Sequence, residues 1–401
     1  MISVAEARAR ILDGLRPTAP ETVALAEAWG RVTAAPVVAR LTQPPADVSA
    51  MDGYALRSAD AHAGAVLRVI GTAPAGHPFE GAVGLGEAVR LFTGSVVPPG
   101  ADAVLLQEDA ERDDEKVVVR EAATAGRHIR RAGQDFRHGD TVIPAGRRLG
   151  ARDIGLAAAA DHPWLLVHRR PRIAILATGD EIALPGEPIP PGGIVSSNSH
   201  ALAALVRASG CDAVVLPLAR DEVAAISGVA DQVAGADLLV TTGGASVGDH
   251  DLVQQALTAR GMVVDFWRIA MRPGKPLMAG RLGEVPVIGL PGNPVSAMVC
   301  AILFAVPALA RLSGLPGAPP PTVAARLGAA LRANDHRADF LRGRLQRDES
   351  GELVVTAFEK QDSAMLKLLA DSDALILRAP HAPALGAGAA VEVIRLDTLG
   401  W

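Results

Sequence analysis

Apolar and polar residues alternate with a regular period through the middle of the chain. From Arg172 onward, apolar runs such as RIAILAT, DAVVLPL and DLLVTTG are separated by amphipathic stretches at 199–208, 221–233 and 251–260. The runs predict buried strands and the stretches predict helices, because the apolar residues recur with the period of each element. Strands that alternate with helices are typical of a parallel sheet with helices on both faces. We therefore expect an α/β domain over 169–315.

Two other regions carry a strand-like pattern. Between 44 and 130, short runs such as VLRVIG and KVVVRE are separated by glycines, which predicts a β-rich inserted domain. After the proline-rich linker LPGAPPP, the short runs over 322–401 predict a small β-barrel or sandwich. The segments 1–43 and 131–168 contain helical and extended patterns. We expect the second segment to pack back on the N-terminal helix, so that the two form one discontinuous helical domain.

Composition and charge narrow the range of functions. A net charge of −5, a pI near 6.1 and an aromatic content of 3% give no basis for nucleic-acid binding. The N-terminus lacks a continuous apolar core, so we expect no secretion signal. The apolar run 297–310 is shorter than the roughly 20 residues of a membrane span, and Pro307 interrupts it. Cys211 and Cys300 lie in apolar surroundings, which predicts buried, reduced thiols in a cytoplasmic protein.

The segment VPVIGLPGNPV, at 285–295, is the most informative motif. Val287–Leu290 predicts a buried strand, Pro291-Gly292 a tight turn, and Asn293 the N-cap of a following helix. A helix that begins there offers unpaired N–H groups and the positive end of its dipole to an anion. The same transition from strand to glycine-bearing loop occurs in ILATGDE and LVTTGGASVGDHD. We therefore expect a large ligand with several anionic groups.

Acidic residues follow two of these strands. Asp180 and Glu181 adjoin a glycine turn, where they either hold Mg²⁺ or simply begin a helix. Ser246, Asp249 and Asp251 follow the glycines of TTGGASVGDHD, which matches neither the Walker A pattern nor the G-x-G-x-x-G fingerprint. This loop predicts either a phosphate and metal site or a structural turn.

Basic residues gather in the sequence WRIAMRPGKP. Arg268, Arg272 and Lys275 can bind oxyanions, because an arginine offers a bidentate fork and a lysine a point charge. The alternative is a solvated basic edge, although the Pro-Gly turn favours fixed positions for the charges. In the β-rich region, SAMDGYAL places Asp52 in an Asp-Gly turn, and LFTGS places Thr93 beside a glycine.

Eight motifs occur together in an order that is known from one family. They are SAMDGYAL, TGSVVPPGADAV, AGQDFRHGD, ILATGDEI, SSNSHAL, TTGGASVGDHD, RPGKPL and GLPGNPVSA. Through them the chain resembles the molybdopterin molybdenumtransferases (MoeA, the molybdenum insertases, to which the C-terminal half of gephyrin is similar). The resemblance extends over nearly the whole chain and implies a multidomain α/β plus β fold.

Four domains follow from this resemblance. A discontinuous helical domain (1–43 and 131–168) would carry the dimer contact, and a β-rich domain (44–130) would be inserted in it. An α/β molybdopterin-binding domain with a parallel sheet (169–315) would precede a C-terminal β-barrel (322–401). Family members are homodimers, and the active site would lie between the third domain of one subunit and the second domain of the other.

The resemblance also implies the reaction and the residues that perform it. The chain would be a transferase that inserts molybdate into the dithiolene of adenylylated molybdopterin, with Mg²⁺ and release of AMP, and a molybdopterin adenylyltransferase would act upstream. The implied catalytic residues are Asp52, Thr93, Asp135, Asp180, Glu181 and Asp251, the last three also as Mg²⁺ ligands. Substrate phosphates would contact Thr178, Gly179, Ser197, Asn198, Gly243, Gly244, Ser246, Gly248, Pro291, Gly292 and Asn293. Molybdate would contact Arg268, Arg272, Lys275 and Ser296.

Two other functions stay open on the sequence alone. The α/β domain by itself would suit a molybdopterin adenylyltransferase, although that enzyme would not need the two β domains. A non-catalytic scaffold that binds the cofactor is the other alternative, against which the acidic loop residues count. The chain departs from the family pattern at His200 and in QDSAMLKLLADSDALI near the C-terminus. Arg342 and Lys367 therefore either reach the site or are surface charges.

Overall fold

The computed structural model describes residues 1–243 and 252–397. Their contacts divide the chain into two compact units. Unit 1 comprises residues 1–21, 30–34 and 166–401, and unit 2 comprises residues 22–29 and 35–165. The chain enters unit 2 twice, at residues 22 and 35, and continues in unit 1 from residue 166.

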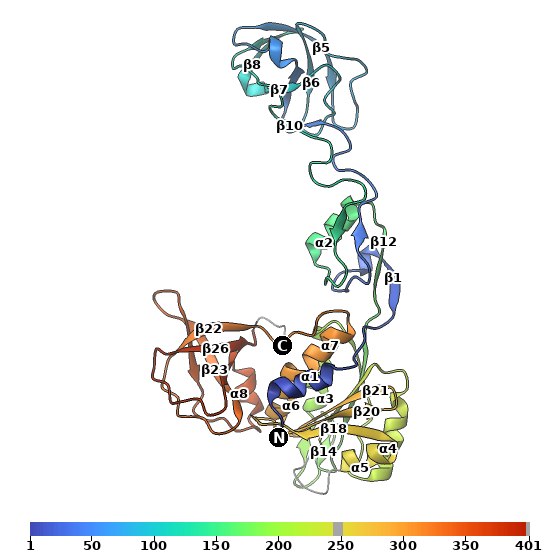
Figure 1. Ribbon diagram of the computed structural model, residues 1–401, viewed down its shortest axis with the longest axis vertical. Helices are drawn as coiled ribbons and strands as arrows, with labels where there is room; N and C mark the ends of the chain where they lie inside the picture. The colour runs from blue at the N-terminus through green and yellow to red at the C-terminus, as the bar shows by residue number, and fades with distance from the viewer. Residues whose placement is uncertain (244–251, 398–401) are drawn as a thin grey trace. The chain divides into compact units, whose positions relative to one another are not determined.

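Unit 2 is built mainly from strands, as the sequence predicts (Figure 1). Its largest sheet has the order β7-β4-β6-β5-β9-β8. Tyr54 and Leu56 on β4 belong to one apolar cluster, whereas Ala55 between them belongs to another. Alternate side chains therefore bury both faces of the sheet. The strands of this sheet are β4 (Gly53–Leu56), β5 (Val66–Ala73), β6 (Glu87–Leu91), β7 (Ala103–Leu106), β8 (Ala110–Asp113) and β9 (Lys116–Val119).

The other elements before residue 170 are short. Helix α2 (Ala151–Ala159) begins where Gly150 N–H donates a hydrogen bond to the Asp153 carboxylate at 2.8 Å, which satisfies one of the free donors of a helix start. The remaining elements are β1 (Pro20–Ala24), η1 (Leu25–Glu27), β2 (Val37–Val38), β3 (Val48–Ser49), η2 (Ser58–Asp60), η3 (Gln107–Asp109), β10 (Ile129–Arg130), β11 (Thr141–Ile143) and β12 (Trp164–His168).

The N-terminal helix α1 (Val4–Leu12) belongs to unit 1. Ser3 Oγ accepts a hydrogen bond from Glu6 N–H at 3.1 Å and caps the helix. Ala7 and Ile11 are buried in an apolar cluster that includes residues of α7 (Val306–Leu312). Helix α7 therefore covers part of α1 within unit 1.

The α/β domain is a six-stranded sheet in the order β16-β13-β17-β21-β20-β18. Its strands are β13 (Arg172–Ala177), β16 (Asp212–Val215), β17 (Leu238–Thr242), β18 (Met262–Arg268), β20 (Pro276–Leu282) and β21 (Val285–Leu290). Strands β16, β13, β17 and β21 are parallel, as predicted, whereas β20 pairs antiparallel with both of its neighbours, β21 and β18. With β20 reversed, the sheet that the sequence predicts as parallel is mixed. The reason is the turn at Gly283, where φ is +58° and the chain reverses within a hairpin.

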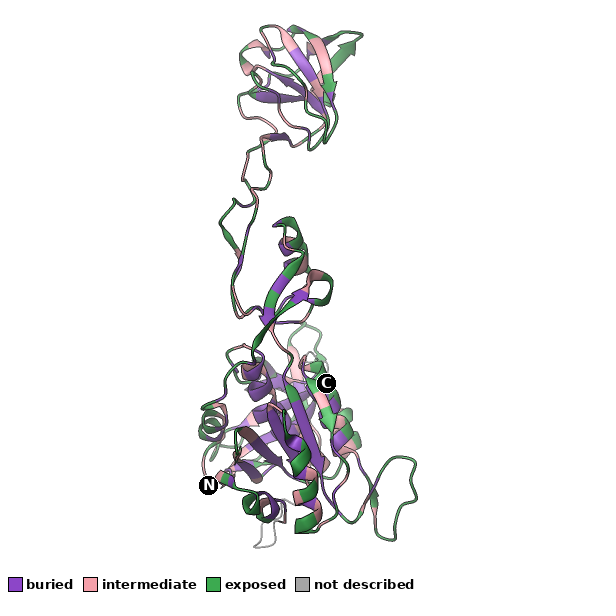
Figure 2. Cartoon of the chain, turned by 90° about the vertical axis from the view of Figure 1, so that its right-hand side faces the viewer, coloured by how far each residue is buried: buried purple, intermediate pink, exposed green. Residues whose placement is uncertain are grey.

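Helices cover both faces of this sheet (Figure 1). On β13, Ile173 and Ile175 pack in one apolar cluster with α1, α3 (Asn198–Ala208), α6 (Pro294–Cys300) and α7. Ala174 and Leu176 pack in a second cluster with α4 (Val223–Ala230) and α5 (Leu252–Ala259). Figure 2 shows the strands between these two layers largely as buried. The sheet is the core of unit 1.

Helices α6 and α7 form one continuous apolar helix over Pro294–Leu312. The helix is long and apolar enough to cross a membrane, but 78% of its most apolar window is buried inside the protein, as in the core helix of a folded domain. Pro307 does not end it, contrary to the expected interruption. A π-helical turn over Ala301–Ala305 precedes the proline and accommodates the hydrogen bond that the proline cannot donate.

The C-terminal strands form a closed barrel rather than a sandwich. The order β23-β24-β22-β26-β25 closes because β25 also pairs with β23. A short strand from the α/β domain, β19 (Met271–Arg272), adds beside β23. The barrel elements are β22 (Thr322–Leu327), β23 (Ala338–Arg347), β24 (Leu353–Ala357), α8 (Leu366–Ala370), β25 (Ala374–Arg378) and β26 (Ala390–Arg395).

Candidate functional site

A cleft of about 700 Å³ opens where strands β13, β17 and β21 end. Parallel pairing aligns these ends, with Ala177 opposite Thr242 and Thr242 opposite Leu290. The loops after the strands therefore meet at the carboxyl edge of the sheet, where open α/β folds bind ligands. The predicted site residues that line the cleft are Thr178, Glu181, Ser197, Asn198, Gly243, Lys275, Pro291, Gly292, Asn293 and Ser296.

Asn198, the first residue of α3, connects the loops of the cleft. Its side-chain amide donates hydrogen bonds to Thr242 Oγ1 at 2.9 Å and to the carbonyl oxygen of Gly292 at 2.7 Å. The Thr242 hydroxyl in turn donates to the carbonyl oxygen of Pro291 at 3.2 Å. One amide thus fixes the end of β17 against the turn after β21.

Gly243 stands where two loops approach closely. Its φ is +95°, and a Cβ added there would lie 2.3 Å from the carbonyl oxygen of Thr178. Only glycine fits this position without displacing the backbone of the neighbouring loop. The predicted site residues that follow, Gly244, Ser246, Gly248 and Asp251, lie outside the described residues.

Acidic side chains gather beside the cleft after β13. At Gly179, φ is +148°, and a Cβ would lie 2.7 Å from Glu181 Oε2, so the glycine allows the acidic turn to form. Asp180 Oδ1 accepts a hydrogen bond from Asp221 N–H at 3.1 Å. Burial raises the pKa of the Asp221 carboxyl, and the negative charges of Glu181 and Asp180 raise this pKa further.

Asp221 is a residue that the sequence analysis missed. It follows the apolar run DAVVLPL, as Asp180 follows RIAILAT, and both strands end at the same edge of the sheet. The signal was therefore present, but the run DAVVLPL was followed by no glycine turn. Its role became visible only through its contact with Asp180.

The acidic residues fit a hard cation. Among residues 1–243 and 252–397, no group of three His, Cys, Asp or Glu side chains is arranged to hold a metal ion. Mg²⁺, however, commonly takes one or two carboxylates together with waters and substrate phosphates. The raised pKa of Asp221 indicates uncompensated negative charge, which a cation would relieve. Of the predicted ligands, Asp180 and Glu181 lie in this turn, and Asp251 lies outside the described residues.

The turn after β21 starts helix α6 at the predicted position. Asn293 has extended backbone angles and Pro294 occupies the first helical turn, as expected. The Asn293 side chain does not cap the helix; instead its Nδ2 donates a hydrogen bond to Ser363 Oγ at 3.0 Å. The N–H of Val295 donates to the carbonyl oxygen of Ser363 at 3.1 Å. The barrel segment around Ser363 therefore lies against the cleft, which Ala364 also lines.

The three predicted basic residues have different surroundings. Lys275 lines the cleft and forms no ion pair with a described residue. The Arg272 guanidinium is paired with Asp339 through two hydrogen bonds, of 2.9 and 2.6 Å. The exposed Arg268 lies 5.9 Å from the centre of the Trp267 ring. Only Lys275 of the three is among the residues that line the cleft.

Arg342 supplies a cation that the sequence left ambiguous. It is 1% exposed, and its Nε, Nη1 and Nη2 atoms have no hydrogen-bond partner among the described residues. Burial lowers the pKa of its guanidinium. Its backbone N–H donates to Gln361 Oε1 at 3.0 Å, which places it beside the segment that reaches Ser363. Arg342 is therefore not a surface charge, whereas Lys367 is exposed and pairs with Asp371.

The residues predicted in unit 2 form a smaller group. Asp52 Oδ1 accepts hydrogen bonds from the N–H and the hydroxyl of Thr93, both at 2.8 Å. The N–H bond, more than the hydroxyl, lowers the pKa of the Asp52 carboxyl, and the nearby Arg90 adds to this effect. Asp135 is exposed elsewhere in the unit. The structure thus brings Asp52 and Thr93 together.

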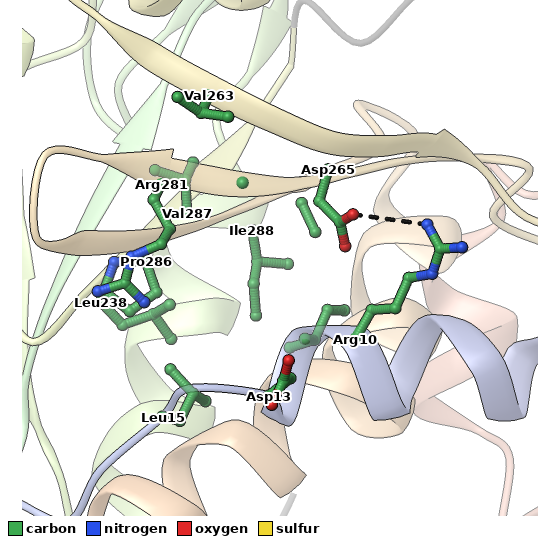
Figure 3. A pocket seen from close by; sticks show the side chains of 13 residues that line it. Arg10, Asp13, Leu15, Leu238, Val263, Asp265, Arg281, Pro286, Val287 and Ile288 are labelled. Carbon is green, nitrogen blue, oxygen red and sulfur yellow. Dashed lines mark hydrogen bonds and ion pairs between the residues drawn. The ribbon is translucent and has the colours of Figure 1, made fainter.

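A second cleft, of about 310 Å³, lies between α1 and strands β18, β20 and β21 (Figure 3). Its rim carries Arg10, which pairs with Glu6 at 2.8 Å and with Asp265 at 3.5 Å. Leu238 and Val287, near the start of two parallel strands, line it. It therefore lies at the amino edge of the sheet, away from the loops that carry the predicted chemistry.

Known families account for nearly the whole chain. Residues 2–160 match the MoeA N-terminal region (domain I and II), residues 174–311 a probable molybdopterin binding domain, and residues 324–396 the MoeA C-terminal region (domain IV). The molybdopterin molybdenumtransferase 2 of Mycobacterium tuberculosis is 37% identical over 387 residues, which cover 94% of this chain and 95% of that protein. This chain belongs to the molybdopterin molybdenumtransferase family.

Other members of the molybdopterin molybdenumtransferase family agree in length and fold. The Haemophilus influenzae enzyme is 33% identical over 398 residues, 98% of each chain. A solved structure of a MoeA protein from Pyrococcus horikoshii superposes with a TM-score of 0.85 at 29% identity, over 98% of this chain and 99% of that chain. The resemblance inferred from the eight motifs is confirmed, and so is the multidomain fold.

Proposed function

We propose that this chain inserts molybdate into the dithiolene of adenylylated molybdopterin and releases AMP. The observation that carries the proposal is one cleft at the carboxyl edge of the sheet. An acidic turn, a lysine and loops that approach each other closely at glycines meet there. A ligand with phosphate groups and a metal oxyanion requires both kinds of charge. The names of the relatives support the same transferase activity.

The loops of the cleft would bind the pterin and nucleotide phosphates. Thr178, Ser197 and Asn198 offer side-chain polar groups there, and Gly243 and Gly292 let the ligand approach the backbone. Placement of the substrate against fixed polar groups supplies most of the catalytic effect in such a reaction. The described loop residues hold these groups in place through the bonds of Asn198.

Mg²⁺ would be held by Asp180 and Glu181, with Asp251 as a further predicted ligand. When bound, it would polarise the phosphoanhydride that water cleaves to give AMP and the molybdopterin monophosphate. Burial and the neighbouring charges raise the pKa of the Asp221 carboxyl, so a bound cation would favour its ionised form. Its carboxyl group therefore makes cation binding in this turn sensitive to pH.

Molybdate would be bound by Lys275 and Arg342, and by Ser296, which lines the same cleft as Lys275. The guanidinium of Arg342, which has no hydrogen-bond partner among the described residues, is the strongest support, since a buried cation without a partner is costly unless an anion joins it. The dithiolene sulfurs of the substrate are the soft final ligands of the metal. The buried thiols of Cys211 and Cys300 take no part, and burial raises the pKa of Cys300 strongly.

The active form would be a homodimer in the cytoplasm, supplied by a molybdopterin adenylyltransferase. Large apolar side chains are exposed at Trp29 (68%) and Trp164 (58%), as in a surface that a second copy covers. Asp52, Thr93 and Asp135 of the partner subunit would then complete the cleft. Trp29→Glu together with Trp164→Glu should convert the dimer to a monomer in sedimentation, and an unchanged mass would contradict this interface.

An insertion assay tests the proposed activity. Purified protein, adenylylated molybdopterin, molybdate and Mg²⁺ are mixed, and released AMP and molybdenum-bound cofactor are measured together. Release of AMP that depends on molybdate supports the insertase. Binding without release of AMP supports a scaffold instead, and formation of the adenylylated compound from ATP and molybdopterin supports an adenylyltransferase. Omission of Mg²⁺ should abolish release of AMP but leave molybdate binding in place.

A further inference from the structure

The ion pair between Arg272 and Asp339 joins the α/β domain to the barrel. Arg272 ends β19 and lies opposite Asp339 on β23 in a parallel pairing. Its Nε donates to Asp339 Oδ1 at 2.9 Å and its Nη2 to Oδ2 at 2.6 Å. Asp339 is only 5% exposed. A bidentate pair of this kind fixes both partners in direction as well as distance.

The pair lies close in sequence to both cations of the proposed molybdate site. Lys275 follows Arg272 by three residues, and Arg342 follows Asp339 by three residues. The chain between Arg272 and Lys275 is closely packed, because a Cβ added at Gly274 would lie 2.3 Å from Cys300 Sγ. Displacement of Arg272 would therefore be passed on to Lys275.

Asp339, the partner on the barrel, is connected to Arg342 in the same way, through strand β23. Side chains alternate along a strand, so Arg342 lies on the same face of β23 as Phe340. Phe340 is buried in the apolar cluster of the α/β core, which shows that this face is turned toward the α/β domain. Three residues of strand span about 10 Å. A slip of β23 along β19 would therefore shift Arg342 relative to Lys275.

We propose that Arg272 and Asp339 are positioning residues that set the separation of Lys275 and Arg342, and that Arg272 does not bind the anion. This inference rests on the proposed function, in which Lys275 and Arg342 bind molybdate. The guanidinium fork of Arg272 is already engaged by a buried carboxylate. Turning it toward a second anion would leave Asp339 charged and unpaired in the interior. Arg342 would thus have the anion-binding role that the sequence predicts for Arg272.

Binding of molybdate alone to the full chain tests the inference. Titration calorimetry is carried out with the native protein, Arg272→Lys, Asp339→Asn and the double variant. We expect each single change to raise the Kd for molybdate at least tenfold, and the double change to add nothing, because one pair is lost only once. A direct ligand predicts the opposite for Asp339→Asn, which releases the guanidinium from its bidentate partner and leaves it only the longer ion pair with Asp335, at 3.6 Å. An unchanged or lower Kd in Asp339→Asn would overturn the positioning role.

Two further variants separate the possible failures. Arg326→Lys alters an ion pair on the same barrel, with Glu352, whose partners are 53% and 51% exposed. It should leave the Kd within twofold of the native value. Arg342→Lys should weaken molybdate binding; if it does not, the anion site proposed above is wrong. A loss in Arg342→Lys without a loss in Asp339→Asn contradicts the positioning role only. If Asp339→Asn does not fold, Asp339→Glu, which keeps the charge but changes the reach, takes its place.

Kinetics give an independent readout. A displaced pair of cations should raise the KM for molybdate in Arg272→Lys and leave kcat and the affinity for adenylylated molybdopterin near their native values. A merely structural role would lower the fraction of active protein, and so kcat, with an unchanged KM. That second pattern would contradict the inference.

Discussion

The side-chain amide of Asn198 donates a hydrogen bond of 2.7 Å to the carbonyl oxygen of Gly292, although the two residues are 94 positions apart in the sequence. This bond fixes the start of α3 against the turn that opens α6. The same amide also reaches Thr242 at the end of β17. The shape of the cleft therefore depends on one side chain that no charge or glycine pattern singles out.

Asn198→Ala should loosen this connection. We expect the affinity for adenylylated molybdopterin to fall about tenfold and the free energy of unfolding to fall by about 1 kcal/mol, the usual contribution of such a hydrogen bond. Ser209→Ala is the matched control, because its hydroxyl donates a bond of 2.8 Å to Leu205 at the other end of α3. The control should lose similar stability in denaturant titration but no affinity. Equal losses of affinity in both variants would contradict the role of Asn198.

Arg342→Met should stabilise the protein and abolish its response to molybdate. The guanidinium is buried without a hydrogen-bond partner in the described part of the chain, and its replacement by an apolar side chain of similar length removes a desolvation cost of about 1–3 kcal/mol. Native protein should show a rise in Tm on addition of molybdate, since the anion binds only the folded state. The variant should start from a higher Tm and show no such rise. A lower Tm without molybdate would argue that Arg342 is a structural residue.

Asp221→Asn should make the protein more stable at neutral pH but less active. The folded state raises the pKa of this carboxyl, so it binds a proton that the unfolded chain has already lost. The native protein therefore loses stability as pH rises from the ordinary pKa of an aspartate through the raised value. The asparagine variant should lack this loss in urea titrations at a series of pH values. Its Mg²⁺-dependent release of AMP should fall, and full activity would exclude Asp221 from the site.

Thr93→Val should raise the pKa of Asp52. The valine removes the hydroxyl donor but leaves the N–H of residue 93, which is the larger cause of the lowered pKa. We expect a partial upward shift in a carboxyl-carbon NMR titration. Thr93→Ser retains the hydroxyl and should leave the pKa of Asp52 near its native value. If the pKa is the same in all three proteins, the hydroxyl bond does not hold the carboxylate.

Much of the fold follows from local pattern. The strands at 172–177, 238–242 and 285–290 are largely buried, and their continuous apolar runs predict them. The turn at Gly283 and the π-helical turn before Pro307 were not foreseen, because each depends on how a neighbouring segment packs. Local propensity determines that a strand or helix exists, whereas packing decides its direction and its end.

The sequence by itself determined the family, the strand-end loops and most of the residues that line the cleft, because a strand followed by glycine and polar residues carries its geometry locally. The tertiary structure alone decided which of the basic side chains are free to bind an anion. Arg272, predicted to bind an anion, is held by Asp339, 67 positions away. Arg342, which could have been a surface charge, is buried, and its guanidinium has no hydrogen-bond partner within residues 1–243 and 252–397. Electrostatic energy depends on distance and burial in space, and neither quantity can be read from separation along the chain.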